Sequence, residues 1–179
     1  MKLLARFIFW VFGWKTEGKV PPLKKFVAIG APHTSGWDVV FGLSAILLWD
    51  LKITFFGKQE LFRFPLGNLL RYLGGVPVDR FSSHNMVDQA VKLFNERDEM
   101  ILALAPEGTR AYVEKWRTGF YYIATQAKVP IVFGYIDFKR KVVGIGETFY
   151  PTGDIEKDIA DIKNYFKQFV AKHPEKGVY

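Results

Sequence analysis

The chain has 179 residues, of which 49% are hydrophobic and 24% are charged, a composition typical of one globular domain with a sizeable core. It contains no cysteine, which excludes disulfides, thiolate nucleophiles and cysteine-ligated zinc. A formal net charge of +7 favours a polyanionic partner (nucleic acid, an anionic membrane surface or a phosphorylated substrate), although solubility alone would also explain it. No recognisable nucleic-acid-binding module is present, so we expect no specific nucleic-acid partner.

The N-terminal stretch, residues 1–14, combines apolar and aromatic side chains with Lys2 and Arg6. No apolar run in the chain reaches the roughly 18 residues that cross a bilayer, and no small-residue cleavage site marks a secretory signal. The pattern predicts a helix that lies either in a membrane interface or against the protein core. We therefore interpret residues 1–179 as a single domain in which residues 1–17 are a candidate interfacial segment.

Strands and helices are expected to alternate along the rest of the chain. The helix over 36–49 is apolar on nearly every face, so it should be deeply buried or should face lipid. The last helix has an apolar stripe that includes Phe166 and Phe169, with acidic residues in its first half and lysines in its second. In order, we expect strands at 25–31, 53–57, 76–78, 100–104, 130–138 and 141–149, the last two as a hairpin, and helices at 36–49, 65–73, from 83, at 118–127 and from 155. This alternation predicts an α/β layered fold with a mostly parallel mixed central sheet flanked by helices.

His33 and Asp38 are the first candidate pair for chemistry. If His33 lies on the loop before a helix and Asp38 in its first turn, the carboxylate can accept the imidazole N–H and leave the other ring nitrogen basic. The alternative is structural, because Ser35 and Asp38 have the spacing of a helix capping box.

The segment Ala105–Arg110 follows a buried strand and is the second candidate. Gly108 would let the backbone approach a ligand, and Arg110 could hold an anion bidentately. The alternative is an ordinary turn. Since ligands of α/β sheets sit beyond the carboxyl ends of strands, this segment and His33 could share one cleft.

Further cations also follow predicted strands, namely Lys58 and Arg80, and Lys115 and Arg117 could add to them. Gathered at one sheet edge, they would form a phosphate site, although each alone is compatible with solvated surface. Metal-binding spacing such as H-E-x-x-H, a G-x-S-x-G elbow and phosphate-binding glycine loops are absent from the sequence, so we expect no metal and no bound cofactor.

Taken together, these residues resemble the glycerolipid acyltransferase family, which contains the 1-acylglycerol-3-phosphate acyltransferases. Four segments match the family's motifs in order: His33 and Asp38 its H-x4-D motif, 75–80 its arginine after a short strand, 106–110 its Pro-Glu-Gly-Thr-Arg block, and 129–132 its apolar segment around a proline. Pro32 and Ala105 stand where the family often has Asn and Phe, which leaves the acceptor open. Only 32 residues precede His33, which we expect to be too few for a two-helix membrane anchor.

The resemblance implies a glycerol-3-phosphate acyltransferase-like fold and an O-acyltransferase of phospholipid biosynthesis. His33, oriented by Asp38, would be the catalytic base, and the acyl group would come from acyl-CoA or acyl carrier protein. The acceptor would be a lysophosphatidic acid-like lysophospholipid. The substrate-binding residues would be Lys58, Arg80, Glu107, Gly108, Thr109 and Arg110.

The protein is then expected to be bacterial, cytoplasmic and peripheral on the inner face of an anionic cell membrane. Two alternatives stay open. The same chemistry could act on another acceptor, such as a lyso-ornithine lipid, a lysophospholipid or a glycolipid, or the chain could be a basic membrane-binding domain without catalysis.

Overall fold

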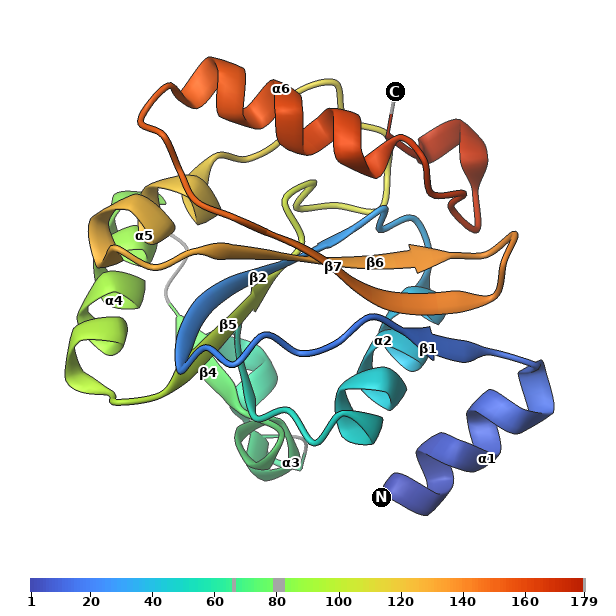
Figure 1. Ribbon diagram of the computed structural model, residues 1–179. Helices are drawn as coiled ribbons and strands as arrows, with labels where there is room; N and C mark the ends of the chain where they lie inside the picture. Colours follow the sequence, from blue (N-terminus) through green and yellow to red (C-terminus); the bar gives the residue numbers. More distant parts are fainter. Residues whose placement is uncertain (66, 79–82, 179) are drawn as a thin grey trace.

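The computed structural model describes residues 1–65, 67–78 and 83–178, and within them the strands form one seven-stranded mixed sheet with helices on both faces (Figure 1). The predicted α/β architecture is confirmed. The strands are β1 (Lys15–Glu17), β2 (Lys25–Ala31), β3 (Ile53–Lys58), β4 (Gly75–Val78), β5 (Met100–Leu104), β6 (Ile131–Asp137) and β7 (Val142–Phe149). The helices are α1 (Lys2–Phe12), α2 (Gly36–Leu48), α3 (Gly67–Tyr72), α4 (Ser83–Glu96), α5 (Gly119–Ala127) and α6 (Ile155–Phe166), with 3-10 turns at 59–62 and 174–176.

The sheet has the strand order β1-β7-β6-β2-β5-β3-β4. Neighbouring strands are parallel except for β6 and β7, which form the predicted antiparallel hairpin. The edge strand β1 was not predicted, because its three residues, Lys-Thr-Glu, are all exposed and show no apolar alternation.

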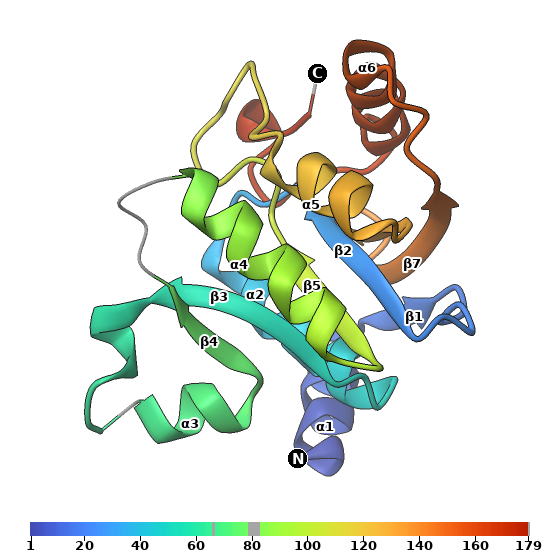
Figure 2. The same ribbon diagram turned by 90° about the vertical axis from the view of Figure 1, so that its left-hand side faces the viewer.

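Each face of the sheet has its own apolar cluster. On one face, α4, α5 and α6 contribute Phe94, Phe120 and Phe166 to the larger core. On the other, α1 and α2 contribute Phe9 and Phe41, which pack with side chains of β6 and β7. Figure 2, turned by 90°, shows α4 and α5 on one side of the sheet and α1 on the other.

The two helices α1 and α2 bury only one side each. Phe9 of α1 and Phe41 of α2 are buried, whereas Trp10 and Trp37 are exposed. The helix over 36–49 was expected to be deeply buried or to face lipid; the structure buries one side of it, at Phe41 and Ala45, and exposes the other, at Val39 and Val40. The prediction for α6 was also too long, since Phe169 lies beyond the helix end at Phe166.

The ends of β2 and β5 fix the place of the site. These strands are parallel neighbours, paired in register from Lys25↔Met100 to Ile29↔Leu104. Their carboxyl ends therefore open side by side at the same sheet edge, so the loops that begin at Pro32 and Ala105 lie next to each other.

Candidate active site

Asp38 holds the loop that carries His33. Its Oδ2 accepts the backbone N–H groups of Thr34 and Ser35, each at 2.7 Å, and lies 3.1 Å from Nδ1 of His33. Ser35 is the N-cap of α2 and forms a capping box with Asp38. The structural and the chemical interpretations of this pair are thus compatible, because one carboxylate oxygen takes part in both arrangements.

The imidazole and the carboxylate differ in exposure. The side chain of His33 is 22% exposed and that of Asp38 is 6% exposed. With Nδ1–H donating to the buried carboxylate, the lone pair of His33 lies on Nε2. The geometry therefore presents a basic nitrogen toward the open part of the site and keeps its orienting partner away from water.

Glu107 fixes His33 from the other side. Both of its carboxylate oxygens accept the backbone N–H of His33, at 2.9 and 3.1 Å, and the residue is only 5% exposed. Burial raises the pKa of Glu107 from 4.5 to about 7, against the opposing effect of the hydrogen bond from His33. Glu107 contacts the backbone of the candidate base and is absent from the lining of both cavities described below.

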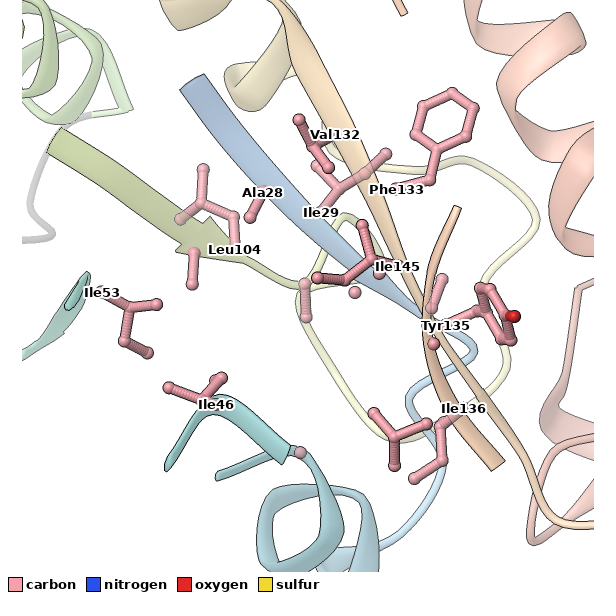
Figure 3. Close-up of a pocket in the computed structure, with 18 of the residues that line it drawn as sticks. Ala28, Ile29, Ile46, Ile53, Leu104, Val132, Phe133, Tyr135, Ile136 and Ile145 are labelled. Atoms are coloured by element: carbon pink, nitrogen blue, oxygen red, sulfur yellow. The ribbon is translucent and has the colours of Figure 1, made fainter. Parts of the chain in front are cut away.

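One of these cavities is apolar and lies between the sheet and α2 (Figure 3). It has a volume of about 300 Å³ and reaches from His33 and Asp38 to Trp49 and Ile53. Ile46 of α2 lies across the cavity from Ala28, Ile145 and other residues of the sheet.

Small residues on the sheet keep this cavity open. Ala28 of β2 pairs with Ala103 of β5, and Gly30 of β2 pairs with Gly134 of β6. All four line the cavity. Successive strand residues alternate between the two faces of the sheet. These alanines and glycines therefore leave the face toward α2 hollow, whereas Val27 and Ile29 are fully buried in the core on the opposite face.

The second cavity is larger and carries positive charge. Its volume is about 680 Å³, and Arg110, Arg117 and Thr109 line it. Among the residues that the structure describes, neither arginine forms an ion pair with a carboxylate. His33 and 103–105 line both cavities, so the candidate base stands where the apolar and the basic space meet.

Gly108 allows Arg117 to approach the Glu107–Arg110 turn closely. Its φ is +68°, and a Cβ at this position would lie 2.5 Å from Nε of Arg117. The side chain of Arg117 therefore packs directly over the Gly108 backbone, and the N–H of Arg117 donates to the carbonyl of Pro106 at 2.8 Å.

The structure brings most of the predicted site residues to one sheet edge. His33 contacts both Asp38 and Glu107, and 108–110 line the basic cavity beside it. Lys58 is the last residue of β3, but its side chain lies outside the described part of the chain, as does Arg80 entirely. The small residues on the sheet were missed, although their occurrence at alternate positions in otherwise bulky strands is a usable signal.

Within residues 1–65, 67–78 and 83–178, no helix is both long and apolar enough to traverse a bilayer. In the same residues, no cluster of three or more histidine and acidic side chains is placed to hold a metal ion.

Comparison with known proteins shows the family of the chain and a similar fold. The model of the family described as Acyltransferase matches residues 15–136. The fold is similar to that of the 1-acyl-sn-glycerophosphate (LPA) acyltransferase PlsC from Thermotoga maritima, with a TM-score of 0.65, 20% sequence identity, and coverage of 96% of this chain and 79% of that one. No curated protein sequence gives a significant match.

Proposed function

The chain belongs to the acyltransferase family, and we propose that it transfers a fatty acyl group from acyl-CoA or acyl carrier protein to the hydroxyl of a lysophosphatidic acid-like acceptor. One observation carries the proposal: His33 stands at the junction of an apolar cavity and a cavity lined by two arginines. A fatty acyl thioester and a phosphate-bearing alcohol need these two environments, with a base between them.

The proposed reaction uses His33 as general base. Nε2 takes the proton of the acceptor hydroxyl while Asp38 stabilises the imidazolium that forms. The hydroxyl oxygen attacks the thioester carbonyl, the C–S bond breaks, and the departing thiolate receives the proton from His33. This route needs no acyl-enzyme intermediate, in keeping with a chain that has no cysteine, and we expect no bound cofactor to be required.

The oxyanion of the tetrahedral intermediate also needs a donor. The N–H groups of His33, Thr34 and Ser35 are occupied by carboxylates, and that of Trp37 by the Ser35 hydroxyl. Gly36 lies between them as the first residue of α2, and its N–H has no partner among the described residues. We assign the oxyanion contact to this amide.

The acceptor phosphate is assigned to the basic cavity. Arg110 lies over the start of α2, since its Nη1 is 3.9 Å from the position of a Cβ on Gly36. Arg117 and the Thr109 hydroxyl line the same space and would complete the contacts to phosphate oxygens. Lys58 and Arg80 stay predicted contributors. Glu107 acts in this proposal by holding His33, and not by touching the phosphate.

The acyl chain is assigned to the apolar cavity. Gly42 and Ile46 of α2 line this cavity, so α2 would help to form the acyl groove. The small residues of the sheet supply the width that a hydrocarbon chain requires, and His33 at the mouth would meet the thioester carbonyl.

Attachment to an anionic membrane is proposed to use α1. The exposed Phe12 ring lies 5.3 Å from that of Trp37, so the apolar surface of α1 continues onto the first turn of α2, close to His33. A peripheral position on the inner face of a bacterial membrane would let a lipid acceptor reach the site from this side. The other exposed apolar side chains of α1 are Leu3, Leu4, Phe7, Trp10 and Val11.

An acceptor panel tests the proposed function. Purified protein is given one radiolabelled acyl thioester, as acyl-CoA or acyl carrier protein, with lysophosphatidic acid, monoacylglycerol, lyso-ornithine lipid, a lysophospholipid or a glycolipid. We expect labelled product mainly from lysophosphatidic acid. Preference for another acceptor would redirect the proposal, and the absence of product from every acceptor with both donors would overturn it.

Vesicle binding tests the attachment separately. Trp10→Ser should reduce cosedimentation with vesicles that contain phosphatidylglycerol. Tyr150→Ser, which alters an exposed ring after β7, is the control and should bind like the wild type. Equal binding by both variants would place the membrane contact elsewhere.

A further inference from the structure

The residues that follow α6 fold back onto the site. Val170 accepts the backbone N–H of Phe138 at 2.8 Å, and the ring of Phe169 stacks on that of Tyr135 with centroids 4.0 Å apart. Nζ of Lys172 lies 5.6 Å from the centre of the Phe138 ring. Residues 167–178, here named the C-terminal strap, are therefore docked by several separate contacts. They lie outside the stretch 15–136 that the family model matches.

The middle of the strap contacts the loop that carries the candidate base. The backbone N–H of His173 donates to Oγ1 of Thr34 at 3.2 Å, across 139 positions of sequence. Thr34 is only 3% exposed, and its own N–H donates to Oδ2 of Asp38 at 2.7 Å. Thr34 thus joins the strap to the carboxylate that orients His33.

These contacts complete a three-sided support for the loop. Glu107 holds the N–H of His33, Asp38 holds those of Thr34 and Ser35, and the strap holds the Thr34 hydroxyl. A base must be placed closely for proton transfer, and a misplacement of about 1 Å can cost on the order of 100-fold in rate. The position of the strap is therefore connected to the position of His33.

We propose that Thr34 is a positioning residue and that the C-terminal strap, acting through its hydroxyl, sets the orientation of His33. The proposal rests on the function proposed above. Thr34 touches neither cavity and so acts only through its neighbours.

Three variants test the proposal. Thr34→Val removes the hydroxyl with little change of shape, and Thr34→Ser keeps it. Thr54→Val is the matched control, because Thr54 of β3 is also buried. Its hydroxyl accepts a hydrogen bond from Nη1 of Arg97 at 3.1 Å. We expect Thr34→Val to lower kcat about tenfold with KM changed less than twofold, and Thr34→Ser to restore kcat. Thr54→Val should change melting temperature but not kcat.

A second measurement is independent of turnover. Hydrogen exchange should accelerate in 32–36 and in 167–178 in Thr34→Val, and in neither segment in Thr54→Val. If Thr34→Val and Thr54→Val have equal kcat, or if exchange in 167–178 is unchanged by Thr34→Val, the proposal is wrong. If the wild type uses none of the acceptors, the proposed function fails, and hydrogen exchange alone decides whether the strap supports the loop.

Discussion

The two cavities beside His33 are neighbours of opposite character. The apolar one is formed by secondary structure: α2 covers a patch of alanine and glycine on the sheet. The basic one is formed largely by the segment 105–110 together with Arg117 and α5, and its cations have no carboxylate partners among the described residues. The shape of the apolar cavity is thus set mainly by the sheet, and the charge of the basic cavity is set mainly by a loop. The candidate base lies where the two cavities meet. Variants that affect one side only can test this division.

Replacing the shared residue should have the largest effect. His33→Ala removes the base that both cavities adjoin, so we expect the release of free thiol from acyl-CoA in the presence of lysophosphatidic acid to fall about 1,000-fold or more. Vesicle binding and the far-ultraviolet circular dichroism spectrum should be unchanged. Thiol release at the wild-type rate would show that His33 is not the base.

The pH dependence of stability tests the burial of Glu107, which holds the backbone of His33. Its pKa of about 7 lies above the usual 4.5, so the folded state binds more protons than the unfolded state between these values. The free energy of unfolding should therefore fall as pH rises from 4.5 to 7, by roughly 3 kcal/mol at 1.4 kcal/mol per unit. Urea titrations should show that Glu107→Gln removes this slope and that the exposed Glu99→Gln keeps it. A wild-type slope in Glu107→Gln would contradict the burial argument.

Arg110→Ala alters only the basic cavity. Loss of a charge-assisted contact to phosphate should lower kcat/KM for lysophosphatidic acid by about 100-fold. Turnover of monoacylglycerol, which lacks the phosphate, should stay as in the wild type. Lys92→Ala, on the outer surface of α4, serves as the control for a lost positive charge. Equal losses with both acceptors would place Arg110 outside the phosphate site.

Gly36→Pro deletes the backbone N–H that we assign to the oxyanion contact, at the junction of the two cavities. Proline suits the first residue of a helix, and Ser35, at φ −145° and ψ 157°, has the extended backbone that precedes proline. We expect kcat to fall between about 10- and 100-fold, with melting temperature unchanged. Gly36→Ala keeps the N–H and should stay near wild-type kcat. Similar kcat values for both variants would remove this amide from the oxyanion contact.

Ala28→Leu alters only the apolar cavity. We expect it to have the smallest effect of these variants. The larger side chain fills part of the cavity opposite α2. The ratio of kcat/KM for a sixteen-carbon over an eight-carbon acyl-CoA should fall about tenfold, with the shorter donor little affected. An unchanged ratio would show that the acyl chain lies elsewhere.

Local signals in the sequence were sufficient for much of the fold. The strands at 25–31 and 100–104 were predicted to the residue, because short apolar runs bounded by turn residues mark buried strands. β1 carries no such signal, since it is exposed and depends on pairing with β7. The end of α6 was misplaced because Phe169 continues the apolar periodicity while packing on Tyr135 from outside the helix.

The candidate site was predictable only in part, for a related reason. Residue type and spacing singled out His33 with Asp38, and the segment 107–110. The contacts between Glu107 and the His33 amide, and between His173 and Thr34, span 74 and 139 positions. They arise from the adjacency of β2 and β5 and from the return of the chain after α6, which local patterns do not encode.

The position of Asp38 has a consequence for how the protein would lose activity. A single oxygen, Oδ2, accepts hydrogen bonds from the two amides just before α2 and from the ring nitrogen of His33. Fraying of this helix end would therefore disorient the imidazole at once, even while the sheet stayed folded. Inactivation by mild heat or denaturant should then precede the global unfolding transition, and the same coupling would prevent evolution from improving the start of the helix independently of the chemistry.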